Sequence, residues 1–425
     1  MRRRPALAWP VALAVLLTTA SLGLTTEGGT PGGRPVTSSV GPGARSGRPR
    51  PPVEAERDAA VRDLLGRRGA AVRDRDRAAF LATVDPASPD LRRAQARLFD
   101  ALADVPLASW SYDLHPETSV GTGDRWAPRV TLRYALAGFD ARPASLEQAP
   151  LFARRGEAWL LTGEDDRHTA RDLWDFGPVV ATRGRRSLVL AHPDQAGLAA
   201  ELAGEADHAV VAVTAVVGRG WAQRVVVLVP ADARELAALA QTTADLSAYA
   251  AVQSSELGTT GTGDPTPVGD RVAVDPTVYT RAGPRGRQVV LTHEVTHLAT
   301  RADTGSGLPQ WLVEGLADEI GFRDSGLAVD RIAADLAAEV RRGVLPATLP
   351  TDDEFTGGSP RLAAVYAEAW LATRLLARRY GDAALLRLYR SVGRGTSLAS
   401  ALRRLGTTPD ALTADWLAEV RGLGG

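Results

Sequence analysis

The sequence predicts an α+β protein with two folded parts: a small α+β domain, then a larger domain in which a mixed sheet precedes a C-terminal helical lobe. Three observations carry this prediction. Two charged helical stretches come before a group of strand-like segments rich in aromatic residues. After residue 172, short apolar strands alternate with helices, and the final third of the chain has helical periodicity. Helices followed by strands indicate an α+β domain, and the later alternation indicates a sheet covered by helices.

The amino-acid composition limits the classes of function that the protein can have. At 425 residues, with 44% hydrophobic residues, the chain is long enough for two or three compact domains with real cores. The 50 basic and 50 acidic residues balance, so no field of one sign favours a nucleic-acid partner. Cysteine is absent, which excludes disulfides, thiol chemistry and cysteine metal ligands.

Residues 1–26 have the pattern of a signal peptide or membrane anchor. Arg2 to Arg4 precede an apolar run, Ala6 to Leu24, as in an export signal. Thr18-Thr19-Ala20 offers a cleavage site, but the run is also nearly long enough to stay as a membrane tether. Both outcomes stay open, and both predict an extracytoplasmic protein, secreted or membrane-anchored. Residues 27–52, rich in Gly, Pro, Ser and Arg, predict a disordered linker.

Residues 53–168 predict the small α+β domain. Charged helical stretches cover residues 53–84 and 91–102, and strand-like segments follow at residues 110–114, 129–135, 151–154 and 158–162. Trp110, Trp126 and Trp159 are predicted core residues. This order of elements, with the phrase FARRGEAWLL at residues 152–161, resembles the NTF2-like fold, a cone-shaped sheet around a helix. Because no catalytic set stands out, we interpret the domain as a binding or spacing module.

Residues 172–425 predict the larger domain. Strands are expected at 179–181, 187–192 and 225–230, and helices at 198–217 and 233–240. Gly258 to Gly263 reads as a loop, and Asp270 to Pro276 as a strand ended by proline. That strand is either a free edge on which an extended peptide could pair, or an ordinary strand of the sheet.

The stretch His293-Glu294-Val295-Thr296-His297 predicts a metal site. Two imidazoles four residues apart lie on one face of a helix, so both can reach one ion, and imidazole suits Zn²⁺. Glu294 can accept the proton of an activated water as general base. The alternative is a buried helix that happens to carry two histidines, but only six histidines occur in the chain and a chance match is rare.

A catalytic zinc needs a third protein ligand, and no histidine follows His297. Asp303 stands where metzincin-type sites place their third ligand, but those sites also need Gly where this chain has Thr300, and a methionine turn, whereas the only Met is Met1. Glu314 is the better candidate. Pro309 suits the first turn of a new helix after a Gly- and Ser-rich loop that lets the chain fold back.

Asp318 lies one turn beyond Glu314 on the same helix face. There it could hydrogen-bond the second nitrogen of a ligating imidazole and fix its tautomer. A solvated helix charge is an equally good interpretation of this residue.

The zinc motif, followed by the phrase Trp311-Leu312-x-Glu314-Gly315-x-Ala317, resembles the gluzincin metallopeptidases, and most closely the bacterial peptidase MA-like domains. The similarity covers roughly the C-terminal 250 residues and continues through residues 366–381, 385–389 and 397–416. It implies a zincin-like fold, with His293, His297 and Glu314 as zinc ligands and Glu294 as general base. The sequence has no counterpart of the Gly-Ala-Met-Glu-Asn phrase that holds a free amino terminus in aminopeptidase relatives, which argues against exopeptidase action.

Peptide hydrolysis also needs a group that stabilises the oxyanion. With no later histidine, tyrosine is the natural choice, and the resemblance points to Tyr366 on a helix well beyond the third ligand. A core tyrosine is an equally good interpretation of Tyr366, and Tyr380 and Tyr389 are weaker candidates.

The predicted function is therefore that of an exported, zinc-dependent metallopeptidase acting on a peptide or protein through zinc-activated water, with no nucleic-acid partner. Two rivals remain: a catalytically silent, zinc-stabilised binding module, and a metal-free interaction protein of the cell envelope. The intact Glu294 argues against the first rival, because a purely structural zinc site has four ligands and needs no base.

Overall fold

The computed structural model describes residues 52–121, 123–242, 246, 250–259, 265–305, 307–356 and 359–424. The predicted leader at residues 1–26 and the linker up to residue 51 lie outside the described residues, as does most of the predicted loop at residues 258–263. Within the described part of the chain, no helix combines the length and apolar character needed to cross a membrane.

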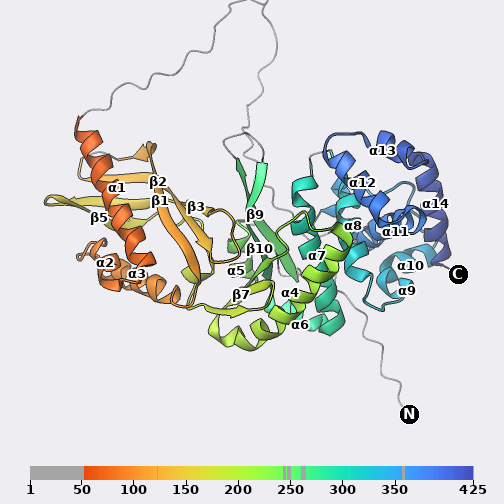
Figure 1. Ribbon diagram of the computed structural model, residues 1–425, viewed down its shortest axis with the longest axis horizontal. Helices are drawn as coiled ribbons and strands as arrows, with labels where there is room; N and C mark the ends of the chain where they lie inside the picture. Colours follow the sequence, from red (N-terminus) through yellow and green to blue (C-terminus); the bar gives the residue numbers. More distant parts are fainter. Residues whose placement is uncertain are drawn as a thin grey trace, which may run out of the picture.

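The N-terminal part consists of three helices and an antiparallel sheet, at the orange and yellow end of Figure 1. The helices are α1 (Pro52–Arg73), α2 (Arg77–Ala82) and α3 (Pro89–Ala101). The strands are β1 (Leu107–Val120), β2 (Arg125–Leu136), β3 (Ala144–Gln148), β4 (Pro150–Arg155) and β5 (Ala158–Glu164). They pair in the order β1-β2-β4-β5, and β3 pairs with β2. Helices therefore precede strands here, as predicted.

The predicted helical stretch at residues 53–84 is broken in the structure. Arg75 has a φ of 58°, a left-handed conformation that a continuing helix excludes. Asp76 then caps the next helix, because its side chain accepts a hydrogen bond from the backbone nitrogen of Ala79 at 2.9 Å. The break turns α2 away from α1 and lets Phe80, fully buried, enter the core.

A second, mixed sheet occupies the centre of the molecule (Figure 1). Its strands are β6 (Val180–Arg183), β7 (Ser187–Ala191), β8 (Val225–Val229), β9 (Ala251–Thr259) and β10 (Pro265–Val274), in the order β6-β7-β8-β10-β9. The strand β8 runs parallel to its neighbours β7 and β10. The strand β6 is antiparallel to β7, and β9 is antiparallel to β10. The strand predicted at residues 270–276 is thus flanked by β8 and β9, and the edge strands of the sheet are β6 and β9. Of the two interpretations of residues 270–276, the free edge was wrong and the ordinary strand of the sheet is confirmed.

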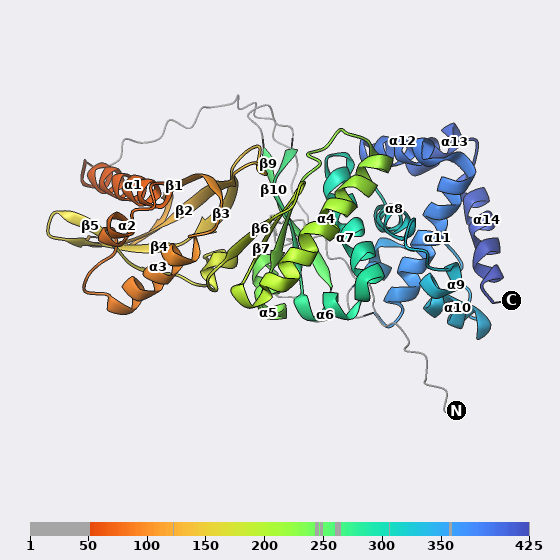
Figure 2. The ribbon, with the colours of Figure 1, turned by 60° about the horizontal axis from the view of Figure 1, so that its bottom comes forward.

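The strands β7 and β8 of this sheet are buried along their whole length, which explains why they are nearly all apolar. Along β8, Val225, Val227 and Val229 pack in the core shared with the helices, whereas Val226 and Leu228 pack in the core shared with the N-terminal part. The helices α4 (Ala196–Val217) and α7 (Gly283–Thr300) pack against each other on the first face (Figure 2).

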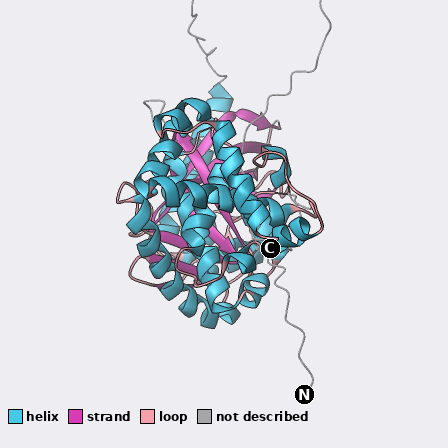
Figure 3. Cartoon of the chain, turned by 90° about the vertical axis from the view of Figure 1, so that its right-hand side faces the viewer, coloured by secondary structure: helices cyan, strands magenta, loops and turns pink. Residues whose placement is uncertain are grey.

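Helices make up the C-terminal part, seen in front of the strands in Figure 3. Besides α5 (Ala233–Leu239), which follows β8, they are α6 (Pro276–Arg281), α7, α8 (Gln310–Phe322), α9 (Val329–Ile332), α10 (Ala334–Arg341), η4 (Asp352–Phe355), α11 (Leu362–Tyr380), α12 (Asp382–Gly393), α13 (Leu398–Arg404) and α14 (Pro409–Gly422). α8 packs between α7 and α11, so three long helices form the centre of this lobe.

A buried ion pair joins the N-terminal part to the central sheet. The guanidinium of Arg271 on β10 donates to both carboxylate oxygens of Asp140, which follows β2, at 2.8 and 2.7 Å. Beside it, Tyr134 packs edge-on against Trp174 with ring centroids 5.0 Å apart. The buried ion pair and the aromatic contact indicate that the N-terminal part and the central sheet pack together as one body.

Candidate metal centre

The helix α7 carries both predicted imidazole ligands. Asp275 caps the preceding α6 by accepting from the backbone nitrogens of Thr277 and Val278, and Gly283, with φ at 67°, makes the turn into α7. From residue 289 to residue 300 the helix is buried all round, because α4, α8 and β9 surround it. His293 and His297 are thus fixed inside the protein.

The helix α8 brings Glu314 to the same place. Gly315, its neighbour, explains how α8 can approach α11 so closely. A Cβ atom at this position would lie 2.2 Å from Oγ1 of Thr373 and 2.4 Å from the carbonyl oxygen of Ala369, both on α11. The Glu-Gly pair in the sequence therefore combines a candidate ligand with the space that its helix needs beside α11.

The three side chains converge on one point. Nε2 of His293 lies 3.0 Å from Nε2 of His297. Oε2 of Glu314 lies 3.3 Å from the first nitrogen and 3.5 Å from the second. With ordinary zinc–ligand bonds of roughly 2.0–2.2 Å, the edges of a tetrahedron around the ion measure about 3.3–3.6 Å. The observed triangle therefore has the dimensions of three ligands around one small cation.

The donor set also fits a cation chemically. His293 and Glu314 are 0% exposed and His297 is 4% exposed, so water does not solvate them. Among the described residues, Oε2 of Glu314 is a buried oxygen with no hydrogen bond of good geometry. Leaving such an oxygen unpaired is costly, and a divalent ion would satisfy it together with both imidazole nitrogens. One ligand atom from each of these three residues lies within 4.8 Å of the other two.

Asp318 holds the first imidazole. Its Oδ1 atom lies 2.8 Å from Nδ1 of His293, and both residues are buried. Burial alone would lower the pKa of His293, but the carboxylates of Asp318 and Glu314 outweigh it and raise the pKa to about 10. The hydrogen bond places the proton on Nδ1 and directs Nε2 toward the other ligands. Of the two interpretations of Asp318, the structure supports the imidazole partner.

Electrostatics keep the ligand carboxylate charged. Burial would raise the pKa of Glu314, but the imidazoles of His297 and His293 lower it to about 2. Glu314 is therefore ionised at any physiological pH, as a metal ligand must be.

Glu294 lies beside the ligands and is buried, with 1% of its surface exposed. Within the described part of the chain, its Oε2 atom has no hydrogen-bond partner. Burial is the largest cause that raises its pKa, and the two histidines oppose it. A buried carboxylate with one unpaired oxygen and raised basicity is the arrangement expected of a proton acceptor.

The other candidate ligands lie elsewhere. Asp303 accepts from Arg390 at 2.9 Å and from Arg394 at 3.2 Å, so its carboxylate is occupied by arginines of α12 and the following loop. Among the earlier histidines, His192 contacts the carbonyl of Pro178 and a carboxylate of Glu235. These contacts agree with the choice of Glu314 over Asp303 as the third ligand.

Tyr366 lies at the start of α11 and is 5% exposed. Its ring packs edge-on against Phe355, with centroids 5.4 Å apart. Tyr389, on α12, lies at the end of α7: its hydroxyl is 2.7 Å from Oγ1 of Thr304 and 3.5 Å from Oγ1 of Thr300. The oxyanion role of Tyr366 stays a prediction.

One residue at the site was missed by the sequence interpretation. Gln310 donates from Nε2 to Oε1 of Glu314 at 2.7 Å. The signal was present, because residues four apart on a helix are neighbours and glutamine is a good donor to a carboxylate.

No family model and no curated protein matches the chain. Among solved structures, the chain is similar to a two-domain M1 zinc metallopeptidase, a mutant bound to L-arginine. The identity is 14%, the TM-score is 0.31, and the match covers 74% of this chain and 93% of that chain. The candidate metal centre therefore rests on the distances and burial within this chain.

Proposed function

We propose that this chain is an exported zinc metallopeptidase of gluzincin type, with a zincin-like second domain. The observation that carries the proposal is the buried triangle of His293, His297 and Glu314, with edges of 3.0, 3.3 and 3.5 Å. Two imidazoles and one carboxylate form a donor set that suits zinc. Three protein ligands leave one coordination position open, as in catalytic zinc sites.

When bound, the ion would supply a Lewis acid that polarises a peptide carbonyl and makes water more acidic. Side chains of the protein would transfer the proton, hold the ligands in position and stabilise the oxyanion. Oε2 of Glu294 would take the proton of the attacking water and pass it to the nitrogen of the leaving amine. Asp318 would hold His293 in place while charge develops at the site. Tyr366 is the residue proposed to donate a hydrogen bond to the oxyanion.

The location and the N-terminal part are proposed from sequence patterns. The basic and apolar start of the chain supports export, followed by secretion or membrane anchoring. The helices and antiparallel sheet of residues 53–168 support an NTF2-like module. Because no catalytic set stands out there, its proposed role is to bind a partner or to act as a spacer. A peptide or protein is the proposed substrate.

A catalytically silent zinc-binding protein is the rival function. The state of Glu294 favours the enzyme, because burying a carboxylate with an unpaired oxygen costs stability and a structural zinc site has no use for it.

Zinc content and activity of the purified protein test the proposal together. We expect one zinc per chain, no zinc in His297→Ala, and unchanged zinc in the control His192→Ala, which removes a histidine of similar burial outside the cluster. Casein or peptide cleavage should stop on chelation and return with zinc. A protein without zinc would contradict the metal site, and a zinc-loaded protein that cuts no peptide in a broad library would favour the rival.

A further inference from the structure

The two oxygens of the Glu314 carboxylate have different surroundings. Oε2 faces Nε2 of His293 and Nε2 of His297, at 3.3 and 3.5 Å. Oε1 instead accepts a hydrogen bond from the side-chain amide of Gln310, one turn earlier on α8, at 2.7 Å. This hydrogen bond holds Oε1 away from the point where Oε2 and the two imidazole nitrogens meet.

We propose that Gln310 is a positioning residue, which makes Glu314 bind the metal through Oε2 alone. This inference rests on the proposed metal centre. If Oε1 were released, the carboxylate could turn and present both oxygens to the ion. The second oxygen would then compete for the coordination position that a hydrolytic site keeps open.

Gln310 is itself fixed from a distant part of the chain. It is the first residue of α8, and the residue before it is Pro309, whose side chain has no oxygen to cap the helix. Asp352, at the start of η4, supplies the missing acceptor: its Oδ1 atom lies 2.8 Å from the backbone nitrogen of Gln310. The position of Gln310 therefore depends on η4.

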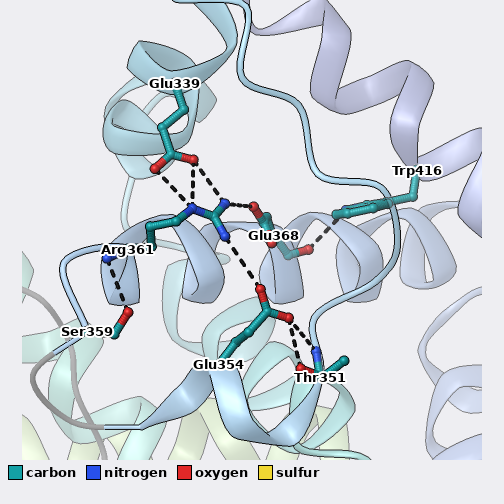
Figure 4. A network of polar contacts seen from close by, with 7 residues as sticks. All are labelled: Glu339, Thr351, Glu354, Ser359, Arg361, Glu368 and Trp416. Atoms are coloured by element: carbon teal, nitrogen blue, oxygen red, sulfur yellow. Dashed lines mark hydrogen bonds and ion pairs between the residues drawn. The ribbon is translucent and has the colours of Figure 1, made fainter.

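A network around Arg361 holds η4 in place (Figure 4). Oε2 of Glu354, on η4, accepts from the backbone nitrogen of Thr351 at 2.8 Å and from its hydroxyl at 3.0 Å, and Oε1 lies 3.4 Å from Arg361. The same guanidinium bonds Glu339 of α10 at 2.9 Å and Glu368 of α11 at 2.7 Å. One arginine thus joins η4 to two helices.

Two further contacts anchor this network. Trp416 on α14 donates to the backbone oxygen of Glu368 at 3.0 Å, which joins a third helix to it (Figure 4). Phe355, the last residue of η4, packs against Tyr366 on α11. The structure therefore provides a continuous set of contacts from the C-terminal lobe, through η4 and Gln310, to one oxygen of the ligand carboxylate.

Substitution of Gln310 by methionine tests the inference. Methionine keeps the length and the helix propensity but has no N–H donor. The matched control is Gln288→Met on α7, because Gln288 also bonds a residue four positions later, Thr292, at 3.1 Å, without contacting a ligand. Zinc affinity is measured by competition with a chelator, and coordination is read from the visible spectrum of the Co²⁺-loaded protein.

We expect Gln310→Met to bind zinc roughly 10-fold or more weakly, which is the size of effect expected for partners of metal ligands. Its Co²⁺ bands should lose the intensity typical of four-coordinate cobalt and resemble those of a higher coordination number. Asp352→Ala should change both readouts in the same direction by a smaller factor. The control should match the wild type.

Two outcomes overturn the inference: wild-type affinity and spectrum in Gln310→Met, or equal losses in Gln310→Met and in the control. Wild-type protein that binds no zinc at all would instead contradict the proposed metal centre, so the two failures are distinguishable.

Discussion

Asp318 and His293, on different helices and 25 positions apart in the sequence, are joined by a buried contact of 2.8 Å between Oδ1 and Nδ1. This contact links α8 to α7 at the candidate metal centre. It also fixes which nitrogen of His293 is available to an ion, because a carboxylate only accepts hydrogen bonds. The geometry of the site therefore depends on Asp318 as well as on the three ligands.

Asp318→Asn should weaken zinc binding by roughly 10-fold or more. The amide keeps the size of the side chain but loses the negative charge that makes His293 a better ligand. Chelator competition measures the effect. Glu319→Gln is the control, since this neighbouring carboxylate pairs with Arg323 instead. Equal affinities in the two variants would show that Asp318 has no such role.

Gly315→Ala should destabilise the protein and disturb the site. The added Cβ would meet a side-chain atom of α11 at 2.2 Å and a backbone atom at 2.4 Å, so α8 must move and Glu314 must move with it. We expect a loss of about 2 kcal/mol or more in the free energy of unfolding, measured with urea, together with weaker zinc binding.

The control for this substitution is Gly204→Ala in α4. A Cβ atom at Gly204 meets no atom within 4 Å, and the residue is an exposed helical glycine. Alanine should therefore stabilise the protein by roughly 0.5–1 kcal/mol. A destabilisation of similar size at both glycines would contradict the account of α8 and α11 packing.

Arg271→Met should cost about 3 kcal/mol or more, because it leaves the carboxylate of Asp140 buried without its partner. The comparison is Arg77→Met, which removes an arginine from an exposed pair with Asp100. Exposed pairs contribute about 0–1 kcal/mol. Urea unfolding of both variants distinguishes the two cases, and equal losses would contradict the role of Arg271 at the junction.

The carboxyl of Asp175 gives a pH test. Burial raises its pKa to about 7, and the hydrogen bond from the backbone of Asp172 and the charge of Arg171 only partly offset this. In the unfolded chain the pKa is about 3.9. The folded protein therefore holds a proton that the unfolded chain releases between these values. The stability contributed by the protonated group is fully present below about pH 4 and is lost as pH rises through about 7.

Asp175→Asn imitates the protonated carboxyl at every pH. Its oxygen can still accept from the backbone nitrogen of Asp172. The variant should gain stability relative to the wild type as pH rises, by roughly 2 kcal/mol between pH 5 and pH 8. Urea unfolding at both pH values measures the gain, and a constant difference would contradict the raised pKa.

The local features of the site could be predicted from the sequence. The period of a helix places His293 and His297 on one face, whatever surrounds them. The loop before Pro309 and the apolar residues around Glu314 indicate a second helix folding back, and the structure brings all three side chains together. The mixed α+β character and the strands β7 and β8 of the central sheet were also predictable, because buried parallel strands are short apolar runs.

Features that depend on distant pairing could not be predicted. Asp352 caps a helix 42 positions earlier, and Arg271 pairs with Asp140 across 131 positions, so neither contact leaves a local pattern. The strand β3 was missed because its sequence, ASLEQ, has only one strongly apolar residue. The strand β9 was missed because its sequence lacks the apolar alternation of an ordinary strand, and the place of β10 in the sheet therefore stayed open.

Peptide-library digestion by zinc-loaded wild type and by zinc-loaded Glu294→Gln tests the central claim most directly. Both proteins should hold one zinc, because Glu294 is not a ligand. The wild type should cleave peptides at defined positions, and Glu294→Gln should lose at least about 10²–10⁴-fold of that activity, since the amide cannot accept the proton of the attacking water. Equal cleavage by both proteins, or no cleavage by either, would contradict the assignment of Glu294 as the general base of a zinc peptidase.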